Sequence, residues 1–216
     1  MKKIKGFAVA FVAVLAVTGA GASAASAAQF NSEASTTELA GSQVTQNLVA
    51  VGNLGEIKCS EVKYSGKLTA KASTTALIHP TYEGCSSYGQ VVKIDTTGCS
   101  YALTASSAAA GNMSIVCDAG KEIVLSGPTL ACTIKIKGQT PSNNTVNYTN
   151  QGSGLTRNIL VDQQIGAQSK VGKGIAYTSS GGYCGASGDN GYIRGPFQIN
   201  GYSDAAHLKQ VGIWIQ

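Results

Sequence analysis

The sequence predicts an all-β protein whose antiparallel strands form a disulfide-stapled β-sandwich, with a partly closed β-barrel as the alternative architecture. Short alternating or β-branched segments recur from residue 41 onward, separated by turn residues and without intervening helices. Six cysteines, an even number, all follow an export signal. Two of these cysteines bracket segments that match each other as a hairpin. Together these observations indicate a small exported β protein.

The stretch from Cys99 to Cys117 predicts a β-hairpin in a defined register. Two alternating segments are joined by a run of small and polar residues, 105–112. If the two cysteines lie opposite each other, the larger apolar side chains of both segments face one another on one side of the hairpin. The pairs in this register are Cys99 with Cys117, Tyr101 with Ile115, and Leu103 with Met113. We therefore expect the hairpin to belong to the core.

The other strands are predicted from alternation and β-branched content, with Asp, Asn and Gly marking the turns between them. In the clearest case, Cys132–Lys137, Cys and Ile alternate with Thr and Lys, which is typical of a sheet with one face in water. A single helix is a candidate at Ser203–Gln210, with Ser203 as its cap. The predicted strands are Val44–Val51, Glu56–Cys59, Lys67–Lys71, Ala76–His79, Gln90–Asp95, Cys99–Thr104, Met113–Cys117, Glu122–Leu125, Cys132–Lys137, Thr145–Tyr148, Arg157–Asp162, Gly174–Thr178, Tyr192–Ile193, Phe197–Ile199 and Val211–Ile215.

Residues 1–28 are predicted to be a secretory signal that is removed. A Lys-rich start leads into an apolar run, Phe7–Val17, and small residues follow for cleavage after Ala27 or Ala28. The run is shorter than the roughly 20 residues of a membrane-spanning helix, and no later stretch reaches that length. We therefore expect a secreted protein, extracellular or cell-wall associated, with no membrane insertion after the signal is removed.

Residues 29–216 are predicted to form one β-sandwich domain, in which residues 29–42 are a flexible arm that leads into the first strand. The best internal boundary is 138–144, which is rich in polar and turn residues. Only one cysteine, Cys184, follows this boundary. Because that cysteine must find its partner on the other side, a single domain is favoured over two.

The six cysteines are expected to form three disulfides, because an exported chain meets an oxidising compartment. A zinc site is disfavoured, since there is no C-x-x-C and neither histidine lies near a cysteine in sequence. We expect no metal and no cofactor. Sequence alone does not choose among the connectivities; the preferred hypothesis pairs Cys99 with Cys117, Cys59 with Cys85, and Cys132 with Cys184.

The charge of the mature chain is close to neutral. Three of the 16 basic residues lie in the signal and none of the 11 acidic ones do, which leaves 13 against 11 and a net charge of +2. The basic residues are also scattered along the mature chain. This distribution argues against nucleic acid as a partner and leaves a surface of hydroxyl and amide groups.

No sequence motif assigns a reaction. The Gly-x-Ser-x-Gly motif of serine hydrolases is absent, and the two histidines, His79 and His207, are predicted to be surface residues. Asp95, Asp118 and Asp189 lie in turns, where carboxylates usually cap backbone N–H groups. Two carboxylates that folding brings together remain a catalytic alternative. The sequence favours a protein that is not an enzyme and leaves the question open.

Four tyrosines in the last quarter of the chain are the candidate binding residues. Tyrosine rings pack on apolar faces of sugars, and neighbouring Asn and Gln side chains can bind their hydroxyls. The alternative is that these tyrosines complete a small core with their hydroxyls in water. The four are Tyr177, Tyr183, Tyr192 and Tyr202.

The sequence around the cysteines resembles that of a set of small exported proteins predicted in soil actinobacteria of the Thermoleophilia kind. The segments that carry the resemblance are Gly55–Cys59, His79–Cys85, Asp95–Tyr101 and Tyr183–Gly185. The likeness covers most of the mature chain and implies a bacterial, exported, disulfide-bonded protein. That group has no assigned activity, so the resemblance implies no catalytic residue.

The leading functional hypothesis is a secreted, non-enzymatic binding protein of the extracellular space or cell surface. Its partner is unknown, with a cell-envelope glycan or protein as the candidate. One alternative is a small secreted polysaccharide hydrolase that uses two carboxylates. Another is a structural component of a surface layer or spore coat.

Overall fold

The computed structural model describes residues 27–127, 129, 131–166 and 174–216, so nearly all of the predicted signal lies outside the described residues. Side chains alternate between buried and exposed along most strands, the pattern of strands with one face in a core. The strands are β1 (Phe30–Ser32), β2 (Thr37–Gln43), β3 (Leu48–Ala50), β4 (Glu56–Leu68), β5 (Ala72–Ser73), β6 (Thr75–Ser87), β7 (Gln90–Val91), β8 (Lys93–Asp95), β9 (Cys99–Ala105), β10 (Ala110–Cys117), β11 (Ile123–Gly127), β12 (Cys132–Ile136), β13 (Asn144–Gln151), β14 (Asn158–Ile165), β15 (Ile175–Ser180), β16 (Gly188–Tyr202), β17 (Gln210–Val211) and β18 (Ile213–Ile215), with 3₁₀ helices η1 (Gly52–Leu54) and η3 (Gly154–Thr156).

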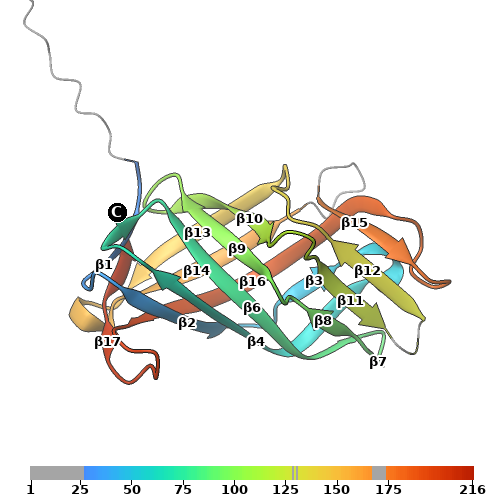
Figure 1. The fold of residues 1–216 in the computed structure, drawn as a ribbon, viewed down its shortest axis with the longest axis horizontal. Coiled ribbons are helices and arrows are strands. Elements are labelled where there is room, and N and C mark those ends of the chain that lie inside the picture. Colours follow the sequence, from blue (N-terminus) through green and yellow to red (C-terminus); the bar gives the residue numbers. More distant parts are fainter. Residues whose placement is uncertain (1–26, 128, 130, 167–173) are drawn as a thin grey trace, which may run out of the picture.

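Eight of these strands close into an antiparallel barrel (Figure 1). Their order is β14-β13-β10-β9-β6-β4-β2-β16, and β16 pairs back onto β14 to complete the circle. The all-β, antiparallel, disulfide-stapled fold is therefore confirmed, and of the two architectures that were considered the chain adopts the barrel. Closure gives each of the eight strands a partner on both sides, which removes the exposed edges that an open sheet would present.

Strand β16 is 15 residues long and carries a second group of strands beyond the barrel (Figure 1). Its first part pairs with β15, which leads through β12 and β11 to β8. Strand β3 lies between β16 and β4. Apolar side chains of these strands join the same buried cluster as those of the barrel, among them Val49, Leu125, Ile134 and Ile175.

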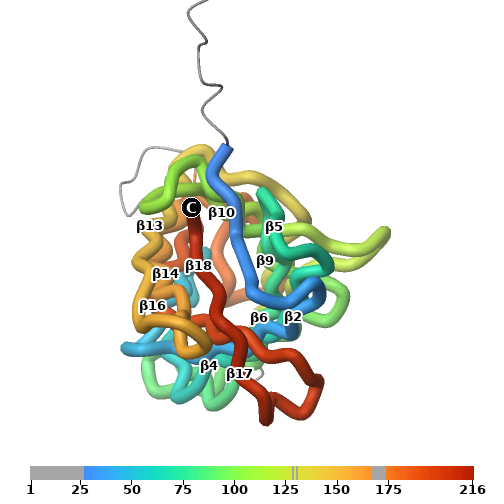
Figure 2. Tube along the Cα trace, turned by 90° about the vertical axis from the view of Figure 1, so that its left-hand side faces the viewer, coloured from blue at the N-terminus to red at the C-terminus, as the bar shows by residue number. Residues whose placement is uncertain are grey.

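The two ends of the described chain meet in a small sheet of order β18-β1-β5 (Figure 2). Gln29 and Gln216 exchange two backbone hydrogen bonds, of 2.8 and 3.0 Å. Residues 29–42 are therefore not the flexible arm that we expected, because β1 belongs to this sheet and β2 to the barrel. The segment is held in place because two of its apolar side chains, Phe30 and Leu39, are buried in the core.

The predicted hairpin is strands β9 and β10, and its register is confirmed. The observed pairs include Cys99↔Cys117, Tyr101↔Ile115 and Leu103↔Met113. Tyr101, Leu103, Met113 and Ile115 are all buried. The hairpin thus supplies two neighbouring strands of the barrel and some of the side chains in its core.

All three predicted disulfides are present. The bond between Cys59 and Cys85 joins β4 to β6, and the bond between Cys99 and Cys117 joins β9 to β10. The third joins Cys132 at the start of β12 to Cys184 in the loop after β15. Each bond therefore links segments that are already neighbours, so the disulfides reinforce a core rather than replace one.

Three amide side chains continue the hydrogen bonding where backbone ladders end. Each accepts the N–H of one residue and donates to the carbonyl of the same residue, as a paired strand would. In one case Asn150 accepts from Ile215 at 2.8 Å and donates to it at 2.9 Å. The three pairs are Asn144 with Met113, Asn150 with Ile215, and Gln139 with Ala176.

Residues 203–210 do not form the helix for which Ser203 was the expected cap. They form a loop of turns between β16 and β17. The Asp204 carboxylate accepts hydrogen bonds from backbone N–H groups that would otherwise bond within a helix, and these bonds fold the loop back on itself. These N–H groups belong to Ala206, Leu208 and Lys209. Within the part of the chain that the structure describes, no helix is long and apolar enough to cross a bilayer.

Candidate functional site

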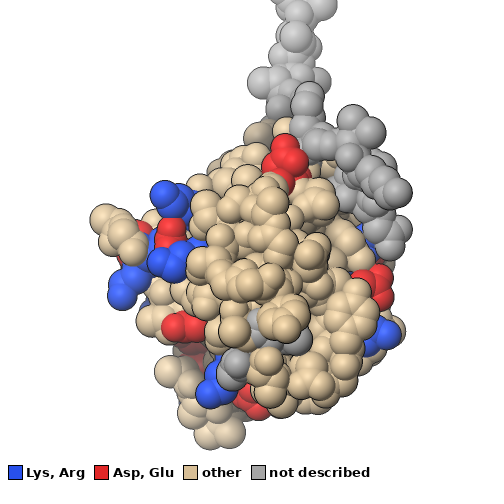
Figure 3. Space-filling model, turned by 90° about the vertical axis from the view of Figure 1, so that its right-hand side faces the viewer, with Lys and Arg blue, Asp and Glu red and all other residues tan. Residues whose placement is uncertain are grey.

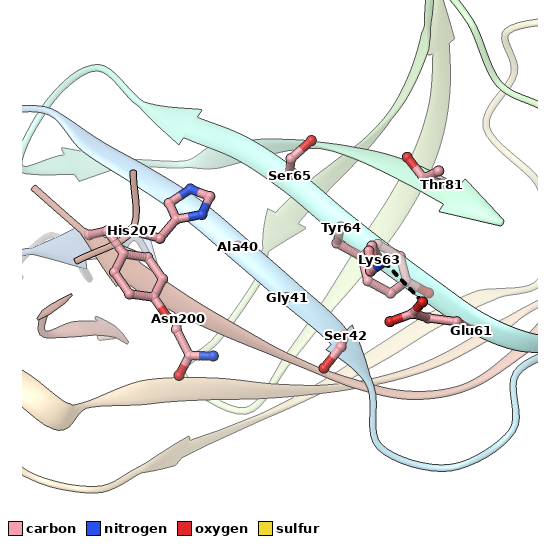
Figure 4. A pocket seen from close by; sticks show the side chains of 11 residues that line it. Ala40, Gly41, Ser42, Glu61, Lys63, Tyr64, Ser65, Thr81, Asn200 and His207 are labelled. Atoms are coloured by element: carbon pink, nitrogen blue, oxygen red, sulfur yellow. Dashed lines mark ion pairs between the residues drawn. The ribbon is translucent and has the colours of Figure 1, made fainter. Parts of the chain in front are cut away.

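A hollow of about 480 Å³ lies on the outside of the barrel, over β16, β2, β4 and β6 (Figure 4). We call it the outer hollow. Side chains of all four strands and of the loop after β16 contribute to it, and most of them are polar. The lining residues are Ala40, Gly41, Ser42, Glu61, Lys63, Tyr64, Ser65, Thr81, Asn200, Tyr202 and His207.

Strand register places the floor of the outer hollow in two rows. Paired residues of antiparallel strands point to the same face, so each row crosses the sheet at right angles to the strands. The first row is Asn200, Ala40 and Ser65, and the second is Ser42, Lys63 and Thr81. With neighbouring strands about 4.8 Å apart, the four strands span about 14 Å. The centre is low because Ala40 has only a methyl group between the longer side chains of its neighbours.

One wall of the outer hollow is the loop after β16. His207 in this loop has a φ of 57°, a left-handed conformation that is uncommon for a residue other than glycine. Its ring packs on the ring of Tyr202 with 4.8 Å between centroids. Three N–H groups on the Asp204 carboxylate hold the loop in this shape, and they lower the pKa of Asp204. These hydrogen bonds thereby keep the imidazole at the edge of the outer hollow.

The opposite side of the outer hollow carries an ion pair (Figure 4). Lys63 Nζ lies 2.9 Å from Glu61 Oε2, and 3.6 Å from Glu83 Oε1 on the neighbouring strand. The hydrogen bond that Lys63 donates to Glu61, with the charges of both carboxylates, raises the pKa of Lys63. The ammonium is therefore fully charged at neutral pH and already engaged.

Several hydroxyl groups of the lining have no hydrogen-bond partner among the residues that the structure describes. Some hydroxyls elsewhere are engaged within the chain, for example Thr96 with the carbonyl of Pro80 at 2.6 Å. The unengaged hydroxyls belong to Ser42, Ser65, Thr81 and Tyr202. Hydroxyls that converge on a hollow and remain free can both donate to and accept from a bound polar molecule.

The four tyrosines predicted as binding residues do not gather on one surface. Tyr202 lines the outer hollow. Tyr177 and Tyr192 are buried, and their hydroxyls donate to Asn190 and to Glu56, at 2.8 and 2.9 Å.

Tyr183, in the same loop as Cys184, is 70% exposed. Because Tyr192 and Tyr202 are ten residues apart on β16, about 30 Å of strand separates them. The structure therefore places Tyr202 at the outer hollow, while Tyr177 lines a separate pocket of about 280 Å³ with residues of β12 and β15.

The interior of the barrel holds a second group of tyrosines, which the sequence did not single out as a set. The hydroxyls of Tyr82 and Tyr101 lie 2.6 Å apart, and burial is the main cause that raises the pKa of both. Tyr64 stacks on Phe197 with centroids 4.0 Å apart and accepts a 2.6 Å hydrogen bond from Asn47. Burial likewise raises the pKa of Tyr64 and of Tyr148. These side chains fill the barrel.

Most residues of the outer hollow carry no sequence signal. Ala40 and Ser42 of β2 and Ser65 of β4 are ordinary small residues, and only the register of the strands brings them together.

The turn acid Asp95 behaves as predicted: the backbone N–H of Thr97 donates to its carboxylate at 2.9 Å, and hydrogen bonds from Thr97 lower the pKa of Asp95. No group of three or more His, Cys, Asp or Glu residues could hold a metal ion among the described residues.

Comparison of the chain with protein-family models, with curated proteins and with solved structures gives no match.

Proposed function

We propose that this chain is a secreted, non-enzymatic protein of the extracellular space or cell surface, and that it binds carbohydrate in the outer hollow. The observation that carries the proposal is the convergence of unengaged hydroxyls with the amide of Asn200 and the rings of Tyr202 and His207. Sugar sites combine rings with hydrogen-bonding groups in this way.

Two further features support the location and class of the protein. Three disulfides are what an oxidising compartment outside the cytoplasm permits, and the predicted signal would direct export. Figure 3 shows a face of the molecule on which the charged side chains lie toward the rim and the described centre is uncharged. Such a neutral surface suits contact with polysaccharide rather than with nucleic acid.

The test is a glycan array together with a pull-down on cell-envelope fractions, using protein that carries its three disulfides. We expect binding in at least one of the two, and a clear reduction for Tyr202→Ala, which removes one ring of the hollow. Tyr183→Ala, at an exposed tyrosine away from the hollow, is the matched control and should bind as the parent does. Absence of binding in both assays would overturn the proposal.

A second candidate, a polysaccharide hydrolase, is favoured by one observation. Glu61, which lines the outer hollow, lies opposite Glu83 on the neighbouring strand, and a glycosidase needs two acids close together. Their side chains are 44% and 52% exposed and share Lys63, whereas a general acid is usually kept protonated by an apolar pocket. Release of reducing sugar that Glu61→Gln or Glu83→Gln abolishes would establish hydrolysis.

A further inference from the structure

We infer that the outer hollow selects neutral oligosaccharides and rejects acidic ones; this inference rests on the proposed function and specifies its ligand. A site for uronic acids, sulfated sugars or phosphate-bearing polymers needs a cation with free donors. The structure offers an engaged cation instead.

The lining of the outer hollow contains one ammonium and one carboxylate, and they neutralise each other. Lys63 and Glu61 are 2.9 Å apart, and Glu83 approaches the same ammonium from the next strand. An acidic ligand would have to displace a carboxylate from Lys63 and would meet the charge of the second one. The electrostatic balance at this side is therefore unfavourable for an anion.

The charges next to the outer hollow are also paired. Two residues along the strands from the row of Ala40, Lys67 of β4 lies opposite Glu38 of β2, and their charged atoms are 2.9 Å apart. On the loop, the Asp204 carboxylate is occupied by three backbone N–H groups. The ammonium of Lys67, like that of Lys63, is therefore already engaged by a carboxylate.

The uncharged groups match the hydroxyls of a neutral sugar. Each unengaged hydroxyl of the lining is both donor and acceptor, as a sugar hydroxyl is. The amide of Asn200 accepts from Gln198 at 3.3 Å through its oxygen, which leaves its N–H groups for a ligand. The adjacent, mutually tilted rings of Tyr202 and His207 supply an apolar edge for the C–H face of a sugar ring.

Ala40 gives the sharpest perturbation, because it lies in the middle of the floor and offers no polar group to a ligand. Ala40→Trp fills the outer hollow and leaves every hydrogen-bonding side chain of the lining in place. Thr145→Trp is the matched control, since Thr145 is exposed on β13, four strands from β4 in the eight-stranded barrel. Both variants add the same ring to an outward-facing strand position, so a general effect of a surface tryptophan would show in both, and urea unfolding of each variant checks its folding separately.

The experiment is isothermal titration calorimetry of the disulfide-bonded protein with two panels of tetrasaccharides. The neutral panel is cello-, malto-, xylo- and mannotetraose, and the acidic panel is tetragalacturonate and tetraguluronate. We expect at least one neutral member to bind about tenfold or more tightly than either acidic one. Ala40→Trp should weaken this binding by about tenfold or more, and Thr145→Trp should leave it unchanged.

Three results would count against the inference in different ways. Tighter binding of an acidic tetrasaccharide, reduced by Ala40→Trp, would overturn neutral selectivity and leave the proposed function standing. Binding that Ala40→Trp does not weaken would overturn the outer hollow as the site. No binding in either panel, together with a negative glycan array, would overturn the proposed function itself.

Discussion

The buried tyrosine pair inside the barrel allows a quantitative test of the core. The hydroxyls of Tyr82 and Tyr101 bond to each other at 2.6 Å, and no other hydrogen-bond partner of either hydroxyl occurs among the described residues. Tyr101→Phe removes one hydroxyl and leaves that of Tyr82 buried and unpaired. The free energy of unfolding should fall by about 1–3 kcal/mol, the penalty for an unsatisfied buried group. Tyr82→Phe should lower it by a similar amount.

The double variant, Tyr82→Phe with Tyr101→Phe, tests whether the loss of stability comes from the unpaired hydroxyl. With both hydroxyls gone, no unpaired group remains, so the combined loss should be smaller than the sum of the single losses by about 1 kcal/mol or more. The assay is urea unfolding with the disulfides intact, followed by fluorescence and circular dichroism. Tyr88→Phe, at an exposed hydroxyl, is the control and should add to Tyr101→Phe without coupling. Additive losses in the Tyr82 and Tyr101 pair would refute the hydrogen bond as the source of the effect.

Three further outcomes are expected. First, the pKa values of the buried tyrosines are raised above the unfolded value near 10, so the stability that they contribute is fully present below about pH 10. Above that pH the free energy of unfolding should fall by about 1.4 kcal/mol per pH unit for each tyrosine that ionises only on unfolding. The measurement is ultraviolet absorbance of tyrosinate, which should rise together with unfolding. Second, replacing Cys132 and Cys184 by alanine opens the largest loop, of 52 residues, and should cost about 4 kcal/mol against about 3 for the 18-residue loop of Cys99 and Cys117, measured by urea unfolding; the reverse order would contradict the loop argument. Third, Asn150→Ala should lower stability by about 1–3 kcal/mol and speed hydrogen exchange in β18; unchanged exchange there would show that the amide does not hold the strand.

Local patterns were enough to predict the hairpin and the disulfides. Alternation in Cys99–Thr104 and Met113–Cys117 leaves one register that puts the larger apolar side chains together, and the structure has it. The same logic did not reach the full length of β16, which was predicted as two short strands interrupted by Gly195 and Pro196. The strand continues there because its pairing with β3 reaches only to Arg194 and its pairing with β2 starts at Phe197. On that side of β16 the proline therefore falls between two ladders, while on the other side it lies opposite Asp162 of β14.

Strand β6 repeats this lesson, because its prediction stopped at His79 before Pro80. In the structure β9 pairs with β6 only as far as Ile78, and the carbonyl of Pro80 receives the hydroxyl of Thr96. Closure of the barrel could not be predicted from the sequence for the same reason, which is that it depends on neighbouring strands. It depends on which distant strands pair, such as β14 with β16, and single-strand periodicity contains no information on that choice.

The candidate site was the least predictable part. Tyr202 was named for its residue type, but His207 was assigned to a helix that the structure replaces with a loop. The floor of the outer hollow includes small residues that can be recognised as part of a site only once their neighbours on other strands are known. Ala40, between Asn200 and Ser65, is the clearest example.

The most direct test of the account is chemical-shift mapping by nuclear magnetic resonance during titration with the neutral tetrasaccharide that binds best. The account predicts that the perturbed amides cluster on β2, on the end of β16 around Asn200 and in the loop that carries His207. Perturbations centred on the loop around Cys184 and Tyr183, with the amides of the outer hollow unmoved, would contradict it.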